Sequence, residues 1–373
     1  MKSIFSILCF VLLFGSCTNS HTNTQDYEIN LKWNKAYEND TFKRSVTGLK
    51  WALSYLGSTL ANDNRSSGIN YKGSIITINI NALGFSKSAS KNLSKLHYIF
   101  KNSEDYKKNN SIDLARYVAL TFGNSHHYYA IVDVPKSLEK FEQLYIFDSV
   151  QGYIDNSSVS KVDRIISFSE PLENNNQGFI SSEVDSISKA ILEYETMEVM
   201  PNGQLRFGIY DEMGELKDAA NNSITRAGKP AKCIWCHEVV VQPLFRQQQN
   251  HEGYLSYMKF SDTLKYFNHK LQNYQDSKWK DKNLLNKKLH TELELLYISF
   301  MEPNAERISR EWNMPLIEVK QKLSHLKTHV NEEFPFLGNL YHRKDIDKLA
   351  PFHCLEVPDS IREKSTNEVN LLK

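Results

Sequence analysis

The sequence predicts an α+β protein, because three kinds of segment follow one another along its 373 residues. A mixed α/β section is expected first, over 27–165, and a strand-rich section follows over 166–225. Helical patterns then dominate the C-terminal region, 226–373. Hydrophobic residues make up 40% of the chain and the formal net charge is +1, as in an ordinary globular protein. This balance argues against a basic nucleic-acid binder and against an acidic disordered chain.

The mixed section alternates between helix and strand signals. Helical apolar spacing over 49–56 ends at the polar stretch 62–68, and the β-branched run 74–80 predicts a strand. The same signals predict helices over 93–100 and 112–119 and strands over 128–134 and 143–147. His126 and His127 border the first of these two strands. Because neighbouring side chains on a strand point to opposite faces, we interpret the two histidines as structural rather than as ligands of one metal.

The strand-rich section contains the clearest local signal for a β-hairpin. The runs 191–200 and 204–210 flank Pro201-Asn202-Gly203, whose residue types favour a tight turn. We therefore expect these two runs to pair as antiparallel strands.

The C-terminal region opens with the loop 226–230 and continues with amphipathic helices. Apolar stripes over 264–274 and 285–300 predict two helices, and Asn313-Met314-Pro315 predicts a break before a helix over 316–326. The segment 308–326 has the outline of a helix–turn–helix. Without a basic excess, we interpret it as ordinary helix packing.

The most specific motif of the chain is Cys-Ile-Trp-Cys-His at residues 233–237. The spacing Cys-x-x-Cys-His is typical of covalent attachment of one c-type haem, with Cys233 and Cys236 bonded to the haem and His237 as proximal iron ligand. A zinc site formed by these three residues with His251 is an alternative, although the usual finger spacing is absent. A redox disulfide is a further alternative, but a Gly/Pro loop precedes the motif where a strand is expected.

The second axial ligand of such a haem is left open by the sequence. A methionine downstream of the motif would suit an electron carrier, and Met301 and Met314 are the candidates. His251, His269 and His290 are the histidine candidates. Each of these side chains also has an ordinary interpretation in helix packing.

Basic residues lie close to the motif on its N-terminal side. Arg226, Lys229 and Lys232 are candidates for pairing with the haem propionates, since carboxylates in an apolar site need partners. A solvated basic rim is the alternative.

The N-terminus predicts export and a membrane anchor. Met1-Lys2 precedes a short apolar run, 4–14, which is too short to span a bilayer. The segment 1–16 resembles a bacterial lipoprotein signal peptide, which implies cleavage before Cys17 and lipidation of that cysteine. Residues 17–26 would then form a polar tether. Asp26 is the first acidic residue after Cys17, so we expect a periplasm-facing anchor in the cell envelope.

The sequence around the motif resembles a group of c-type-haem lipoproteins of Bacteroidota. The resemblance covers Ala231 to Glu238, with Gly228-Lys229-Pro230 before it and Gln242-Pro243 after it. It implies attachment of a single haem in the cell envelope and no particular activity. The sequence also departs from small stand-alone cytochromes c, because no amphipathic helix leads into Cys233.

The leading hypothesis is therefore a lipid-anchored monohaem protein that passes electrons to a redox partner in the envelope, without binding nucleic acid. A haem enzyme with an open sixth position, acting on peroxide or another substrate, is the second hypothesis. The third is an interaction or sensor module in which haem or zinc is structural. Cys354 is the remaining cysteine, and we expect it to be buried and inert.

Overall fold

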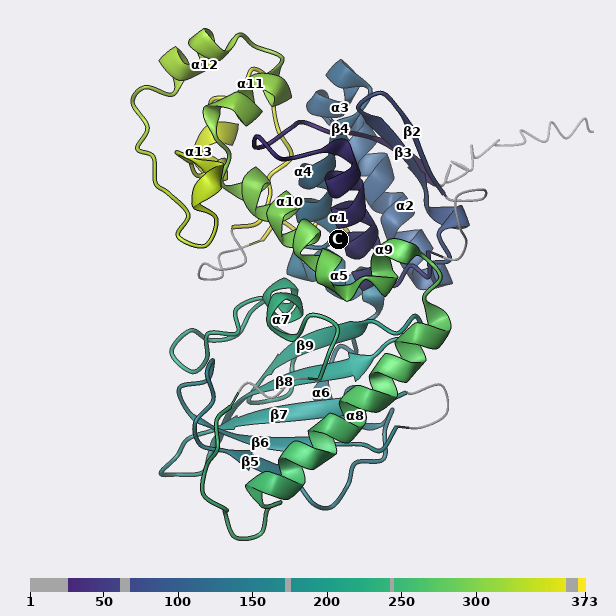
Figure 1. Ribbon diagram of the computed structural model, residues 1–373, viewed down its shortest axis with the longest axis vertical. Helices are drawn as coiled ribbons and strands as arrows, with labels where there is room; N and C mark the ends of the chain where they lie inside the picture. Colours follow the sequence, from purple (N-terminus) through teal and green to yellow (C-terminus); the bar gives the residue numbers. More distant parts are fainter. Residues whose placement is uncertain (1–25, 61–67, 172–175, 242–244, 360–367) are drawn as a thin grey trace, which may run out of the picture.

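The computed structural model describes residues 26–60, 68–171, 176–241, 245–359 and 368–373, and it confirms the α+β class. The molecule is elongated and has two parts (Figure 1): a mainly helical part with a small sheet, and a part built on a larger sheet. The expected signal peptide (1–16), Cys17 and nearly all of the tether lie outside the described residues.

The small sheet has four strands in the order β2-β3-β1-β4. These are β1 (Glu28–Lys32), β2 (Ile69–Lys72), β3 (Ile75–Asn79) and β4 (Ile112–Asp113). The strand expected over 74–80 is β3, which pairs antiparallel with both β1 and β2. The helices of this half of the chain are α1 (Phe42–Tyr55), η1 (Ile80–Ala82), α2 (Lys87–Asn102), α3 (Glu104–Asn109), α4 (Leu114–Thr121), α5 (Ser125–Val132) and α6 (Leu138–Glu142).

Two strand predictions in this half are wrong. Residues 128–132 of the first run belong to helix α5, because Asn124 caps α5 by accepting a hydrogen bond from the His127 N–H, and the aromatic and aliphatic side chains pack around the helix. The run 143–147 is a turn that follows α6. Among the described residues, its one strand-like pairing is an isolated bridge between Phe147 and Ser169.

The larger sheet has five antiparallel strands in sequence order. These are β5 (Gly152–Ile154), β6 (Asp163–Phe168), β7 (Gly178–Val184), β8 (Ile191–Val199) and β9 (Leu205–Asp211). The predicted hairpin is confirmed, with β8 and β9 paired from Glu193↔Asp211 to Val199↔Leu205. Because the sheet begins at β5, the boundary expected at residue 165 falls inside β6.

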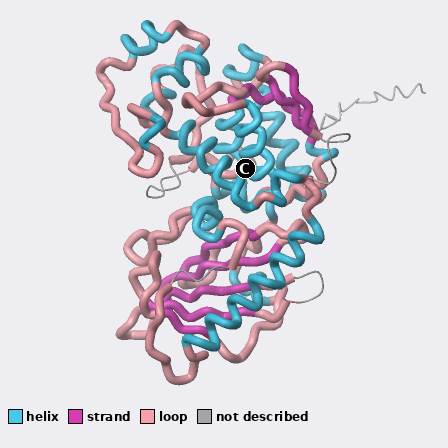
Figure 2. Tube along the Cα trace, in the orientation of Figure 1, coloured by secondary structure: helices cyan, strands magenta, loops and turns pink. Residues whose placement is uncertain are grey.

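One face of the larger sheet is covered by helix α8 (Tyr257–Lys278), which crosses it diagonally (Figures 1 and 2). Phe267 of α8 packs against Phe168 and Phe179 of the sheet at centroid distances of 5.4 and 5.7 Å. The short helix α7 (Pro230–His237) lies beside β9. The C-terminal region is therefore divided: α7 and α8 pack on the sheet, whereas later helices return to the helical part.

Those later elements are α9 (Lys282–Leu285), η3 (Lys287–His290), α10 (Thr291–Met301), α11 (Ala305–Trp312), α12 (Leu316–Lys322), η4 (Pro335–Leu337) and α13 (Arg343–Asp347). Helix α10 packs along α1. The main hydrophobic core extends through both parts of the molecule, and α11–α13 enclose a smaller second core. The predicted helix over 285–300 is interrupted, since α9 ends at Leu285 and α10 starts at Thr291.

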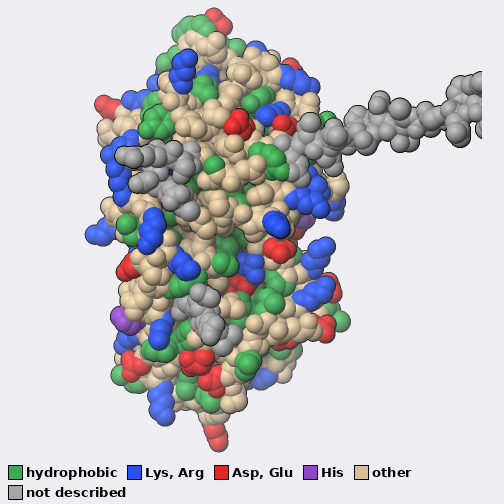
Figure 3. Space-filling view, turned by 90° about the vertical axis from the view of Figure 1, so that its right-hand side faces the viewer, with side chains coloured by type: hydrophobic (Ala, Val, Ile, Leu, Met, Phe, Trp, Pro, Cys, Tyr) green, Lys and Arg blue, Asp and Glu red, His purple; other side chains and the backbone are tan. Residues whose placement is uncertain are grey.

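The surface shows no concentration of charge of one sign on the face drawn in Figure 3, where basic and acidic side chains are interspersed. Among the described residues, no helix has both the length and the apolar composition to cross a membrane.

Candidate functional site

Helix α7 places the three residues of the Cys-x-x-Cys-His motif on one side. Gly228 has a positive φ of 69°, and Pro230 then starts the helix at a position where its missing N–H costs nothing. Positions three and four apart on a helix share a face, so Cys233, Cys236 and His237 point to the same side. No disulfide joins Cys233 and Cys236.

The opposite side of α7 is fixed to the helical part. The Trp235 ring packs against Phe122 and Tyr297 at centroid distances of 6.0 and 5.5 Å. Directly after His237, Glu238 has a positive φ of 52°, an uncommon conformation for a residue other than glycine. The Glu238 carboxylate pairs with His290 at 3.2 Å, and its carbonyl accepts a hydrogen bond from the Tyr55 hydroxyl at 3.0 Å. These contacts fix the chain immediately after the motif.

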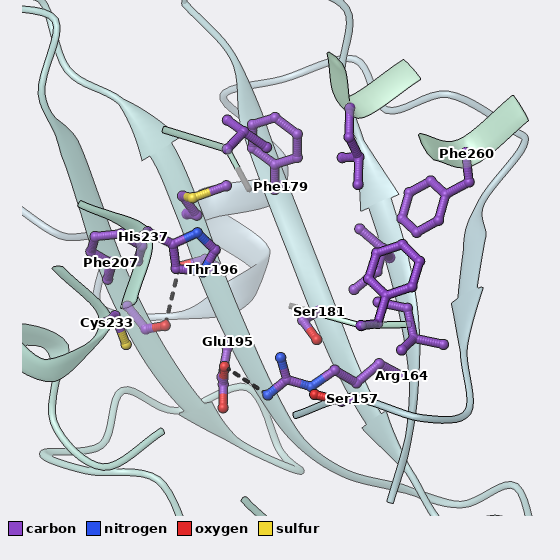
Figure 4. Close-up of a pocket in the computed structure, with 17 residues that line it drawn as sticks. Ser157, Arg164, Phe179, Ser181, Glu195, Thr196, Phe207, Cys233, His237 and Phe260 are labelled. Carbon is purple, nitrogen blue, oxygen red and sulfur yellow. Dashed lines mark hydrogen bonds and ion pairs between the residues drawn. The ribbon is translucent and has the colours of Figure 1, made fainter. Parts of the chain in front are cut away.

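A cavity of about 110 Å³ lies between α7, α8 and the larger sheet (Figure 4). Cys233 and His237 line it on one side, while Arg164 and Phe260 lie on the other. Its remaining wall is largely apolar and includes Ile166, Phe179, Phe207, Val241 and Leu264. The cavity thus collects side chains from segments far apart in the sequence around one cysteine and one histidine of the motif.

The cavity favours the neutral form of both motif residues that line it. Burial lowers the pKa of His237 to about 4, and the positive charge of Arg164 acts in the same direction. Burial likewise raises the pKa of the Cys233 thiol well above its usual value. The His237 ring packs against Phe207 with a centroid distance of 5.5 Å. At neutral pH, His237 is therefore a neutral imidazole, the form that binds metals.

The charged group of the cavity wall is a cluster of Arg164, Glu183 and Glu195. Nε of Arg164 lies 2.7 Å from Oε1 of Glu183, and Nη2 lies 3.2 Å from Oε2 of Glu195. The remaining Oε1 of Glu195 is buried and makes no hydrogen bond with a described residue. Arg164 and Glu195 line the cavity, so the cluster provides a cation and an acceptor at its edge.

The basic residues expected near the haem propionates lie outside the cavity lining. Arg226 is exposed, and the Lys232 ammonium donates a hydrogen bond to the Arg226 carbonyl. Lys229 is buried and forms an ion pair with Glu368 from the C-terminal segment. Arg164 is instead the cation at the cavity.

The methionines expected as distal ligands also lie outside the cavity lining. Met301 is buried near the end of α10, and Met314 packs against the second core. The methionine that does line the cavity is Met197 of β8.

The candidate histidines have other partners. His251 pairs with Asp155 at 2.8 Å, His290 with Glu238, and His269 accepts a hydrogen bond from Asn273. Within the described part of the chain, no group of three or more His, Cys, Asp or Glu side chains is arranged to hold a metal ion. Cys233, Cys236, His237 and His251 are therefore not assembled as a zinc site in this structure.

The adjacent histidines His126 and His127 lie on helix α5 rather than on a strand, and they have separate contacts. Nδ1 of His126 lies 3.1 Å from Asp218. The ring of His127 is bound between the Leu120 carbonyl and the Leu371 N–H. Cys354 is buried in the second core, and burial raises the pKa of its thiol to about 12, as expected for an unreactive cysteine.

Sequence reasoning missed Met197, Arg164 and Glu195, which all precede the motif. The available signal was strand alternation: Arg164 and Ile166 share one face of β6, and Glu195 and Met197 share one face of β8. Nothing in the local sequence marks that face as the one that meets α7.

The donor groups of α7 suit covalent haem attachment, but the cavity beside them does not match the size of a haem. Two thiols and a neutral imidazole share a helix face beside an apolar wall, although only Cys233 and His237 of these line the cavity. Arg164 is already paired with Glu183 and Glu195. The cavity volume of about 110 Å³ is below the 300–1,000 Å³ typical of ligand pockets, so the cavity as it stands does not enclose a porphyrin.

Comparisons with family models, with curated proteins and with solved structures give no match to this chain.

Proposed function

We propose that this chain holds one covalent haem c and carries single electrons in the cell envelope. The observation that supports the proposal is that Cys233 and His237 line an apolar cavity and share a helix face with Cys236. When bound, haem supplies an iron that changes oxidation state by one electron.

In this proposal the residues of α7 have separate roles. Cys233 and Cys236 would hold the haem through thioether bonds, each made by addition of the thiol S–H across one vinyl group, so that nothing is released. His237 would hold the iron as a neutral imidazole, the form that its lowered pKa favours. The apolar wall excludes water and, with the charges near it, adjusts the reduction potential.

The experiment that tests this proposal is production of the exported protein in a host with c-type maturation machinery. We expect the mass to increase by one haem, and the pigment to remain on the chain after denaturation and extraction with acidified acetone. The variant Cys233→Ser/Cys236→Ser loses covalent pigment, whereas the control Cys354→Ser retains it. Pigment that is extracted from the unaltered protein, or that never appears, contradicts the proposal.

A second candidate function is a haem enzyme with an open coordination position. The observation that favours it is the cluster of Arg164 and Glu195 at the cavity edge, with a buried carboxylate oxygen available as acceptor. Such groups can position or deprotonate a ligand near a metal. Ferrous protein that binds CO, and ferric protein that reacts with peroxide, would favour this function over electron transfer.

We also propose that the protein is held at the membrane by lipids on Cys17 and faces the periplasm, where it meets its redox partner. The support is the resemblance of residues 1–17 to lipoprotein signals, which is part of the resemblance to Bacteroidota haem lipoproteins. Cys17→Ser should move the protein from the detergent phase to the aqueous phase in a detergent partition experiment.

A further inference from the structure

The described part of the chain begins against helix α2. The Asp26 carbonyl is hydrogen-bonded to Nδ1 of His97 at 3.1 Å, and the Asp26 carboxylate pairs with Lys101 at 3.1 Å. Asp26 lies nine positions after Cys17, the residue proposed to carry the lipid. Since an extended chain gains at most about 3.5 Å per residue, the point where the chain meets α2 lies within about 30 Å of a membrane that holds Cys17.

The outer face of α2 carries positive charge without compensation. Lys87, Lys91 and Lys95 are exposed and follow one another every four residues, so they form one stripe along the helix. Helix α2 contains no acidic residue, and its opposite face is buried in the core. Within the described part of the chain, the one ion pair of α2 is that of Lys101 with Asp26, so the stripe itself is not neutralised.

An exposed aromatic side chain lies in the same stripe. Tyr98 is 56% exposed and lies three residues after Lys95 and seven after Lys91, on the same side of the helix. A tyrosine with its apolar ring and polar hydroxyl suits the boundary between a membrane and water, as does a lysine. The whole chain has a net charge of only +1, so attraction to an anionic surface depends on this local arrangement.

We propose that the outer face of α2, defined by Lys87, Lys91, Lys95 and Tyr98, lies against anionic phospholipid headgroups of the membrane that carries the anchor. This inference rests on the proposed lipidation of Cys17 and does not involve haem. The lipid holds the chain at the bilayer, whereas the lysine stripe determines which side of the protein faces it. Both act at one place, because the segment that leads to Cys17 leaves the protein beside α2.

The test uses the Cys17→Ser protein, which lacks the lipid, and vesicles of phosphatidylglycerol mixed with phosphatidylcholine. The protein should sediment with these vesicles at low salt, remain in solution with pure phosphatidylcholine, and be released at about 0.5 M salt, which screens the charges. Lys87→Gln/Lys91→Gln/Lys95→Gln should bind the anionic vesicles roughly 100-fold more weakly, at about fivefold per lysine. The three side chains are exposed, so we expect the variant to fold.

The matched control is Lys265→Gln/Lys270→Gln/Lys278→Gln, which removes the same charge from exposed positions of α8 and should bind like the parent protein. An equal loss in the two triple variants overturns the proposed face, because binding then depends on total charge alone. Cys17→Ser protein that does not bind anionic vesicles overturns the docking. Wild-type protein in the aqueous phase of the detergent partition is a different result: it overturns the anchor, whereas the vesicle experiment alone decides the face.

Discussion

At the scale of single residues, the cavity wall places two carboxylates around one guanidinium. The Glu183 side chain is fully buried and, besides Arg164, accepts hydrogen bonds from Ser160 and Ser181. Burial raises the pKa of Glu183 to about 8, and the neighbouring charge of Glu195 adds to this effect. Glu183 therefore keeps its proton at neutral pH, and Arg164 is balanced mainly by Glu195.

This arrangement predicts that the protein loses stability as the pH rises. The pKa of Glu183 is about 8 in the folded protein, against 4.5 for an ordinary glutamate. Between these two pH values the folded state holds a proton on Glu183 that the unfolded state has released. The contribution of Glu183 to the free energy of unfolding is therefore fully present at low pH and declines toward pH 8, by up to ~1.4 kcal/mol per pH unit. Denaturant unfolding at pH 5, 6.5 and 8 should show this slope, and Glu183→Gln should reduce it. The exposed Glu212→Gln is the control; an equal slope in Glu183→Gln and wild-type protein would contradict the prediction.

The motif residues could be identified from sequence, whereas their cavity partners could not. Cys233, Cys236 and His237 are adjacent in the chain, so their spacing alone predicts a shared function. Met197 and Arg164 lie near the motif only because of strand pairing and because α7 packs against β9. These are long-range contacts, which the local sequence around the motif does not show.

At the scale of elements, helix α7 is anchored by the C-terminal segment. The buried ammonium of Lys229, directly before α7, pairs with Glu368 and donates a hydrogen bond to the Asp359 carbonyl at 3.0 Å. Glu368 also accepts a hydrogen bond from the Ser125 N–H at 2.7 Å, at the start of α5. One carboxylate thus joins the beginnings of two helices.

Removing that carboxylate should destabilise the protein strongly. Glu368→Ala leaves the Lys229 ammonium buried without its counter-charge, a change that typically costs about 3–5 kcal/mol. The double variant Glu368→Leu/Lys229→Met should recover much of the loss, because it removes both buried charges. Chemical denaturation measures the effect, with the exposed Glu356→Ala as control. A loss below about 1 kcal/mol would show that the ion pair contributes little.

Element predictions failed where tertiary packing outweighed local propensity. Tyr128 to Val134 is rich in residues that favour strands, but the Asn124 cap and burial around the helix stabilise α5 instead. The β8–β9 hairpin was predicted correctly because its turn residues and alternating strands agree.

At the scale of the whole molecule, the sheet and the helical part share one core rather than forming separate units. The tip of the β8–β9 hairpin inserts between helices: Asn202 donates hydrogen bonds of 2.8 Å to the Ser54 and Ser58 carbonyls, at the end of α1. The Asn202 carbonyl accepts a hydrogen bond from the Trp279 indole at 2.8 Å. The α+β class followed from composition and periodicity, but this connection could not be predicted, since it depends on where a turn docks.

Because the core is continuous, we predict one cooperative unfolding transition for the whole chain, with tryptophan fluorescence and far-UV circular dichroism changing together. Asn202→Ala leaves the Ser58 carbonyl and the Gln204 N–H without their side-chain partner, while the Ser54 carbonyl keeps its bond from the Gly57 N–H. It should lower the free energy of unfolding by about 2–6 kcal/mol, at 1–3 kcal/mol for each of the two buried groups left unpaired. Both signals should shift to the same lower midpoint, because the hairpin tip contributes to both parts. The exposed Asn81→Ala should leave the midpoint unchanged. Two separate transitions in the wild-type protein would show that the sheet and the helices fold as independent units.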